Sequence, residues 1–162
     1  MIPYLENAKI EHFYPMHIVE RKMKDTERKR ISVQPVLQTL LFVKSSKEIL
    51  DPIVNELKLR LSLSSNVYYR DLGTKKLITV PEEQMRNFIA VAGSGQEQVI
   101  YLSNEEVRLK EGKKVRVIGG AFEGVEGILM RIQGESRVVV SLTNLFSVGT
   151  AFIPSRFILP IE

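Results

Sequence analysis

The sequence contains no cysteine and no tryptophan. Without cysteine the chain can form neither a disulfide framework nor a thiolate metal site, which fits a reducing compartment. No apolar run approaches the roughly 18 residues that a membrane span needs. The first residues, MIPYLENAKIEH, lack the basic region and hydrophobic core of a secretory signal. These absences lead us to expect a cytoplasmic protein that makes no contact with a membrane.

Motifs typical of common enzyme classes are also missing. The sequence has no nucleophile elbow, Walker loop or dinucleotide fingerprint, and Gly93-Ser94-Gly95 lacks the strand and helix context of a phosphate loop. His12 and His17 would lie on opposite faces of one strand, with no cysteine or carboxylate cluster at ligand spacing. We therefore expect no enzymatic activity, no metal and no cofactor.

The chain has a mild excess of basic residues, with a net charge of +4. Much of this excess lies between Glu20 and Arg30, which we expect to form the tip of an exposed hairpin. The basic side chains of this segment are Arg21, Lys22, Lys24, Arg28, Lys29 and Arg30. Acidic residues are interspersed among them, so the segment fits either a solvated loop or a surface that contacts phosphates.

The first half alternates between helix-like and strand-like segments. The spacing of Ile2, Leu5 and Ala8 predicts a helix near the start. Residues 10–19 are rich in aromatic and β-branched side chains and predict a strand that begins or breaks at Pro15. Strand character returns in residues 31–43, and short extended segments are expected at 65–70 and 77–80, on either side of a turn at 71–74.

Two longer helices are predicted. Asp51 before Pro52 is a capping signal with proline at the first helical position. Ser45 and Glu48 have capping-box spacing and would start the helix earlier, but Pro52 would then be interior, so we favour the later start. Residues 81–92 form the clearest helix, with acids in the first turn and an apolar face that should cover a sheet.

The stretch from Lys110 to Val140 is punctuated by glycine. β runs at 115–118, 128–132 and 138–140 are separated by glycine-rich turns. Six glycines between Gly119 and Gly149 make a helical state unfavourable, at about 1 kcal/mol each relative to alanine. The pattern predicts a small, strongly bent all-β module, preceded by an extended segment at 99–102 that lies against either half.

This module resembles the KOW domain, an SH3-like barrel. The matching residues of its repeating glycine and valine pattern are Gly112, Val115, Val117, Gly120, Phe122, Gly124 and Gly127. With the order of elements before it, nearly the whole chain resembles the NusG family of transcription elongation factors. The phrases at 10–16, 78–88 and 117–127 look closest to UpxY-type antiterminators of polysaccharide loci.

The resemblance implies an α+β chain of two domains. Residues 1–93 would form an NGN-like domain, an RNP or ferredoxin-like antiparallel sheet with helices, and residues 94–108 a linker to the KOW barrel at 109–162. Family members usually begin with a strand carrying a Trp-Tyr pair, whereas this sequence begins partway through the following helix. Loss of that central strand would expose two strand edges, so we expect an incomplete or rearranged first sheet, which a second copy could complete.

The resemblance also implies a function. A NusG-like factor binds the clamp helices of the largest RNA polymerase subunit and suppresses pausing or termination, here at polysaccharide operons. The polymerase-binding strand would be 37–42, with Leu37, Leu40 and Phe42 as contacts, although an apolar strand is by default core. Alternation puts Leu37 on one face of such a strand and Leu40 and Phe42 on the other.

Further partners follow from the same resemblance. The basic hairpin would contact upstream or non-template DNA, and Phe122 of the KOW domain would be either a partly exposed turn residue or a barrel plug. Family KOW domains engage a ribosomal protein or a termination factor. The alternative class is a KOW-type RNA- or ribosome-binding protein whose first domain is a structural platform.

Overall fold

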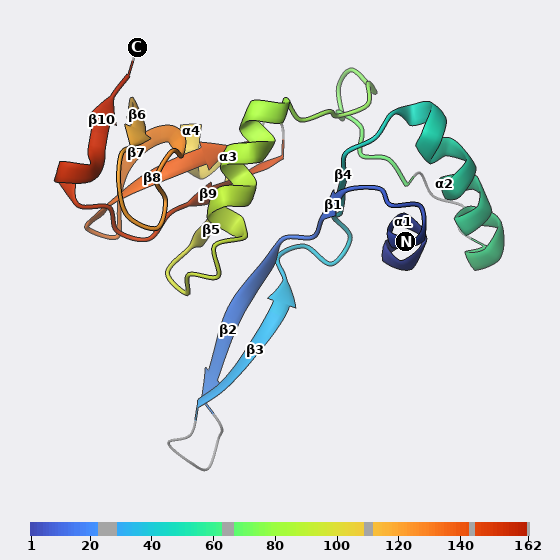
Figure 1. The fold of residues 1–162 in the computed structure, drawn as a ribbon, viewed down its shortest axis with the longest axis horizontal. Coiled ribbons are helices and arrows are strands. Elements are labelled where there is room, and N and C mark those ends of the chain that lie inside the picture. Colours follow the sequence, from blue (N-terminus) through green and yellow to red (C-terminus); the bar gives the residue numbers. More distant parts are fainter. Residues whose placement is uncertain (23–28, 63–66, 109–111, 143–144, 162) are drawn as a thin grey trace. The chain divides into compact units, whose positions relative to one another are not determined.

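The computed structural model describes residues 1–22, 29–62, 67–108, 112–142 and 145–161. The fold is mixed α+β, and its strands pair in antiparallel fashion (Figure 1). By packing the chain divides into two compact units. Unit 1 joins Met1–Tyr14 to Leu37–Ile78, and unit 2 joins Pro15–Val36 to Thr79–Glu162. No helix in the described part of the chain is long and apolar enough to cross a membrane.

The described residues of unit 1 form two helices and two short strands. In chain order they are α1 (Ile2–Asn7), β1 (His12–Phe13), β4 (Phe42–Val43) and α2 (Lys47–Leu61). The predicted N-terminal helix is confirmed, and Leu5 on its inner face is fully buried. The strands β1 and β4 form a two-stranded sheet. The other strand pair of the first half, β2 (Met16–Lys22) with β3 (Lys29–Pro35), belongs to unit 2.

The start of α2 was predicted too late. The helix begins at Lys47, with Ser46 as N-cap, and Pro52 lies in its interior. The Asp51 carboxylate serves as a tertiary partner instead of a cap: it accepts hydrogen bonds from Lys47 Nζ at 2.7 Å and from Tyr68 Oη at 2.9 Å. Five residues, Lys47 to Asp51, therefore precede Pro52 in the helix, although a proline cannot donate a backbone hydrogen bond there.

The segment after α2 is less regular than predicted. Of the strand expected at 65–70, the described residues contribute only an isolated bridge between Arg70 and Leu77. The turn between them is confirmed. Asp71 Oδ1 accepts bonds from the backbone amides of Gly73 at 3.1 Å and Thr74 at 2.7 Å, an arrangement typical of aspartate in turns.

Unit 2 contains the larger sheet, with strand order β10-β6-β7-β8-β9-β5. A separate ribbon pairs β2 with β3. The elements of the unit are β2 (Met16–Lys22), β3 (Lys29–Pro35), α3 (Glu82–Ala92), β5 (Ile100–Ser103), α4 (Asn104–Arg108), β6 (Lys113–Val117), β7 (Glu126–Ile132), β8 (Glu135–Ser141), β9 (Phe146–Gly149), the 3-10 helix η1 (Ser155–Phe157) and β10 (Ile158–Pro160).

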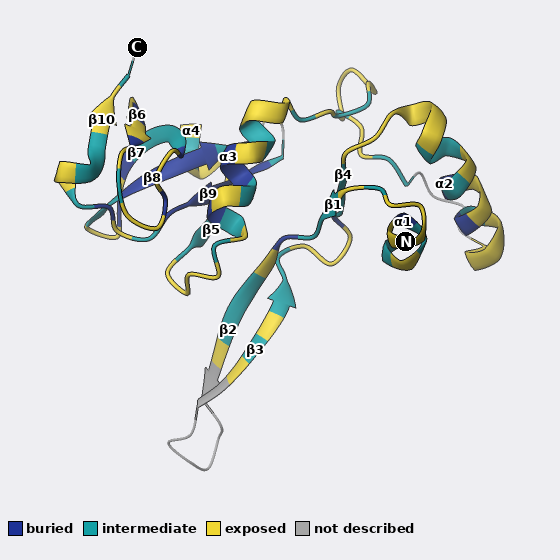
Figure 2. Ribbon diagram, viewed as in Figure 1, coloured by how far each residue is buried: buried dark blue, intermediate teal, exposed yellow. Residues whose placement is uncertain are grey.

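The three β runs predicted in the second half are confirmed as β6, β7 and β8. β7 and β8 are joined by a two-residue turn, Gln133-Gly134, with φ of 53° and 84°, as a tight hairpin turn requires. Buried positions gather on β7, β8 and β9, whereas β2 and β3 are mostly half-buried or exposed (Figure 2). The main core of unit 2 therefore lies in the six-stranded sheet.

The predicted helix at 81–92 is confirmed as α3, and its apolar face does cover a sheet. Phe88 on that face is fully buried and packs edge-on against Phe146 of β9. Asn87 Oδ1 accepts a hydrogen bond from the backbone amide of Glu126 in β7 at 3.0 Å. The sheet beneath α3 is thus the six-stranded one.

Residues 94–108, expected to link two domains, contain β5 and α4. The extended segment predicted at 99–102 is confirmed as β5, which pairs with β9. Arg137 of β8 fixes the chain just before it. The residue is 5% exposed, and its guanidinium donates to the backbone carbonyls of Gln98 at 2.6 Å and Thr150 at 2.7 Å, and to Glu135 Oε2 at 2.7 Å.

Candidate functional site

Residues 20–30 were predicted to form the exposed tip of a hairpin, but residues 20–22 and 29–30 belong to the paired strands β2 and β3. The register places Arg21 opposite Arg30 and Lys22 opposite Lys29. Lys24 and Arg28 lie outside the described residues. Directly opposed residues of an antiparallel pair have neighbouring Cβ atoms, and like charges there repel each other. The register therefore places four basic positions of the sequence in two adjacent pairs of the ladder.

The ribbon also carries exposed apolar side chains. Ile31 is 59% exposed and Val33 is 61% exposed, two residues apart on one face of β3. At the other end the strands are tied together where the Val36 amide donates to the Pro15 carbonyl at 3.0 Å. A two-stranded ribbon is only marginally stable alone. The exposed Ile31 and Val33 give its β3 face apolar area that a partner could cover.

The proposed polymerase-binding residues do not lie on one strand. Residues 37–41 form a turn, closed by a hydrogen bond from the Leu40 amide to the Leu37 carbonyl at 3.2 Å, and only Phe42 belongs to a strand. The predicted strand at 37–42 is therefore wrong. Its alternation argument fails because Tyr14 Oη donates to the carbonyl of Gln38 and Thr39 Oγ1 contacts Tyr69 Oη, contacts that hold a turn.

Burial separates the three side chains. Leu40 is 4% exposed and belongs to the core of unit 1, whereas Leu37 is 44% exposed and Phe42 is half-buried. Leu37 is therefore the residue of the three whose side chain a partner could contact most fully in this structure.

The residues of the glycine-rich pattern lie in and around β6, in the turn that leads from β6 to β7, and at the start of β7. Gly112 precedes β6, and Gly120 and Gly124 adopt positive φ in the turn between β6 and β7. Phe122 in that turn is 4% exposed, which favours the plug-like alternative over an exposed turn residue. At Gly127 a Cβ would lie 2.5 Å from the Val139 carbonyl oxygen, so the neighbouring strand excludes a larger residue.

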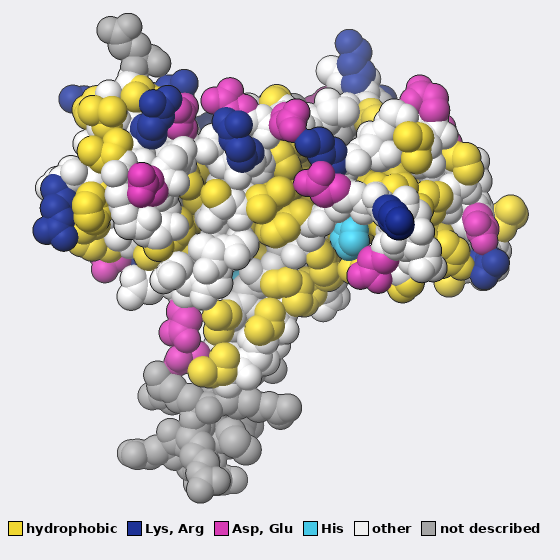
Figure 3. All heavy atoms as spheres, in the orientation of Figure 1, with side chains coloured by type: hydrophobic (Ala, Val, Ile, Leu, Met, Phe, Trp, Pro, Cys, Tyr) yellow, Lys and Arg dark blue, Asp and Glu magenta, His cyan; other side chains and the backbone are white. Residues whose placement is uncertain are grey.

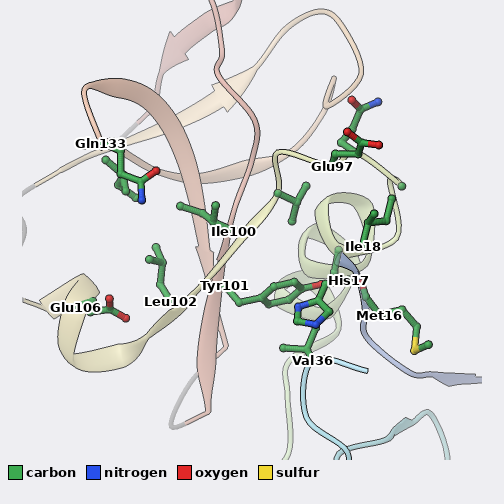
Figure 4. A pocket seen from close by; sticks show the side chains of 15 residues that line it. Met16, His17, Ile18, Val36, Glu97, Ile100, Tyr101, Leu102, Glu106 and Gln133 are labelled. Atoms are coloured by element: carbon green, nitrogen blue, oxygen red, sulfur yellow. Dashed lines mark hydrogen bonds between the residues drawn. The ribbon is translucent and has the colours of Figure 1, made fainter. Parts of the chain in front are cut away.

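Unit 2 also contains a pocket of about 720 Å³ that the sequence did not reveal. Its apolar lining includes Ile100 and Leu102, which pack against the core cluster of Met130, Ile132 and Val139. In Figure 4 these two side chains point toward Gln133 and Glu106, whereas Tyr101 points the opposite way, toward His17 and Val36. The pocket therefore extends along both faces of β5.

Aromatic contacts order the Tyr101 side of this pocket. The Tyr101 ring lies 6.3 Å from His17 and 6.1 Å from Phe146, and its hydroxyl donates to the Met16 carbonyl at 3.4 Å. Burial raises the pKa of Tyr101 to about 12, so the phenol stays a neutral donor. The extended segment at 99–102 was the only sequence signal for this site, and it gave no indication of a pocket.

The structure places the two histidines on different strands. His12 lies on β1 and His17 on β2, so the prediction that they share one strand is wrong. His12 Nδ1 contacts the Ile10 carbonyl at 3.0 Å. Within the described ranges, no three His, Cys, Asp or Glu side chains are placed to hold a metal ion.

On the face shown in Figure 3, acidic and basic side chains are interspersed, with hydrophobic ones between them. No protein-family model matches this chain, and no curated protein is significantly similar to it.

Proposed function

We propose that this chain is a transcription elongation or antitermination factor of the NusG type, which binds RNA polymerase and suppresses pausing or termination. Its site of action would be polysaccharide operons. In this proposal the chain catalyses no reaction itself. It binds the polymerase and nucleic acid and holds them in one geometry.

The observation that carries the proposal is the register of the β2–β3 ribbon. Arg21 opposes Arg30 and Lys22 opposes Lys29, and opposed like charges cost stability unless an anion lies between or beside them. Phosphates of upstream or non-template DNA supply such an anion. A ribbon that holds four basic positions together at its end is suited to contact a nucleic acid backbone without reading its sequence.

The second half supports the same family proposal. Five strands follow one another in the spatial order β10-β6-β7-β8-β9, and the pattern residues Gly120, Phe122 and Gly124 occupy the first turn of this set. An antiparallel set of this order, with a buried aromatic in the turn, is compatible with a KOW module. A helical form of this segment would have to accommodate its glycines.

The polymerase contact is proposed at the turn 37–42 and centres on Leu37. A partner helix that lies in an apolar groove derives most of its affinity from a few buried side chains, each contributing about 2 kcal/mol or more. Leu37 and Phe42 offer accessible apolar surface for such a contact, while Leu40 supports the turn from the core.

The test is a terminator readthrough assay with purified polymerase on candidate leader sequences. We expect the chain to increase readthrough and to be retained by immobilised polymerase. If polymerase fails to retain it while ribosomal subunits or structured RNA do, the chain is instead an RNA- or ribosome-binding protein.

A ribbon variant refines this assay. Replacement of Arg28, Lys29 and Arg30 by glutamine should weaken the complex on DNA and reduce the slope of log affinity against log salt. Replacement of the exposed Lys113 and Lys114 by glutamine removes positive charge from β6 and serves as control. An unchanged salt slope in the ribbon variant would show that the ribbon makes no phosphate contacts.

A further inference from the structure

β5 is an edge strand of the six-stranded sheet. It pairs with β9 on one side, and no strand among the described residues pairs with its other side. Ser103 directs its amide away from β9, because that amide donates to Glu106 Oε2 at 2.7 Å. Phe146, opposite Ser103 in the register, uses its carbonyl to accept from Leu142. By the alternation of an antiparallel ladder, the amide and carbonyl of Tyr101 also face the open edge.

The open edge is short and bounded. Ser103 and Glu106 form a reciprocal cap, in which Ser103 Oγ accepts from the Glu106 amide at 3.3 Å, so the C-terminal end of β5 passes directly into α4. At the N-terminal end, Arg137 holds the Gln98 carbonyl at 2.6 Å. The backbone of β5 is thereby fixed at both ends, which reduces the ordering cost of binding at its edge.

The pocket provides space on both faces of this edge. One face is apolar, with Ile100, Leu102 and Ile132. The other presents Tyr101 beside His17 (Figure 4). Side chains of an added strand alternate between two faces, so an extended peptide at the β5 edge would place successive side chains on the two sides of the pocket.

The charge of the lining is opposite to that of the chain. Among the described residues that line the pocket, two are carboxylates, Glu97 and Glu106, and none is lysine or arginine. The whole chain carries a net charge of +4. The two glutamates flank β5 in sequence, and they lie on opposite sides of the pocket in Figure 4. A ligand along β5 would therefore meet negative charge near each end.

From these observations we propose that the β5 edge binds an extended segment of a partner protein by strand addition. The segment has apolar residues at alternate positions and lysine or arginine at its ends. Its alternate side chains contact Ile100 and Leu102, its backbone pairs with Tyr101, and its basic ends lie near Glu97 and Glu106. This site is separate from the proposed polymerase and DNA contacts.

The test uses a blocked synthetic peptide of about seven residues, with valine alternating with threonine and arginine at both ends. Isothermal titration calorimetry with the full chain should detect binding, and NMR shifts should map to residues 97–106. A matched peptide with an N-methyl group on its central residue cannot donate the strand hydrogen bond. It should bind at least about tenfold more weakly.

Two charge-reversal variants distinguish a local contact at Glu97 from an effect of the net charge of the chain. Glu97→Lys should weaken binding of the arginine-ended peptide about five- to tenfold. Glu123→Lys makes the same charge change in the exposed turn between β6 and β7, outside the pocket, and should leave the affinity within about twofold. Equal losses in both variants would show that the peptide responds only to net charge, and the proposal would fail.

Other outcomes would also overturn it. Equal affinity for the N-methylated and unmodified peptides would exclude strand addition. Self-association of the chain without peptide, abolished by Glu97→Lys, would assign the edge to β3 of a second copy, where exposed Ile31 and Val33 follow Lys29 and Arg30. None of these measurements involves polymerase, so the result is independent of the proposed function.

Discussion

The ring of Phe88 on α3 meets the ring of Phe146 on β9 edge to face, with centroids 5.5 Å apart. Phe88 is fully buried and Phe146 is 8% exposed, so the pair lies in the core of unit 2. Two residues far apart in the sequence thus join a helix of the first half to the sheet of the second. The core of unit 2 therefore includes α3 as well as the glycine-rich strands that follow it in the sequence.

Truncation of Phe88 should therefore destabilise the second-half sheet. Phe88→Ala removes a large buried ring and its aromatic partner contact, and should lower the free energy of unfolding by about 3–5 kcal/mol. Urea unfolding followed by far-UV circular dichroism measures the change. Glu83→Ala, exposed in the first turn of α3, should cost less than about 1 kcal/mol. Similar losses in both variants would mean that α3 does not contribute to this core.

Gly127 tests the close approach of β7 and β8. A Cβ there would lie 2.5 Å from the Val139 carbonyl oxygen, so Gly127→Ala forces the strands apart and should cost about 2–3 kcal/mol. Gly134→Asn is the control for backbone strain without a steric clash, because that site has open space and a φ of 84°, where asparagine is less strained than other residues. Thermal unfolding should show a clearly larger drop for the first variant than for the second.

The turn at 37–42 allows binding and stability to be separated. Leu37→Ser changes a side chain that is 44% exposed, so it should reduce retention on polymerase while leaving the unfolding transition near its original midpoint. Leu40→Ser changes a residue that is 4% exposed and should destabilise unit 1 by about 2–4 kcal/mol. Full retention of the Leu37 variant would remove the turn from the proposed interface.

Asp51 should make unit 1 sensitive to acid. Hydrogen bonds from Lys47 and then from Tyr68 hold the pKa of Asp51 below its ordinary value near 3.9. Its contribution to stability is therefore fully present above about pH 4 and is lost as the pH falls through the lower pKa of the folded state. Between about pH 2 and pH 5, the free energy of unfolding should depend less steeply on pH in Asp51→Asn than in the original chain.

The control for this titration is Glu123→Gln, which changes an exposed carboxylate in unit 2. It should leave the acid dependence of unit 1 as it is in the original chain. If the free energy of unfolding falls with decreasing pH in the same way in Asp51→Asn and in the original chain, protonation of Asp51 is not linked to unfolding.

Sequence reasoning was most successful where a local pattern is sufficient. Turn residues, caps and apolar spacing act within a few residues, so α1, α3, the Asp71 turn and strands β6 to β8 were predictable. It failed where a distant partner changes a local preference. Asp51 accepts a hydrogen bond from Tyr68 instead of capping α2. Tyr14 and Tyr69 contact residues 38 and 39 in a turn whose composition favours a strand.

The sequence by itself determined the β character of the runs within residues 115–140, because glycine spacing and β-branched runs disfavour any helical alternative there. It also determined the concentration of basic residues between 21 and 30. Only the tertiary structure decided that Arg21 opposes Arg30, that Leu40 is core while Leu37 is exposed, and that a pocket follows the edge of β5. These features depend on register and on contacts between residues distant in the chain, which no local pattern specifies.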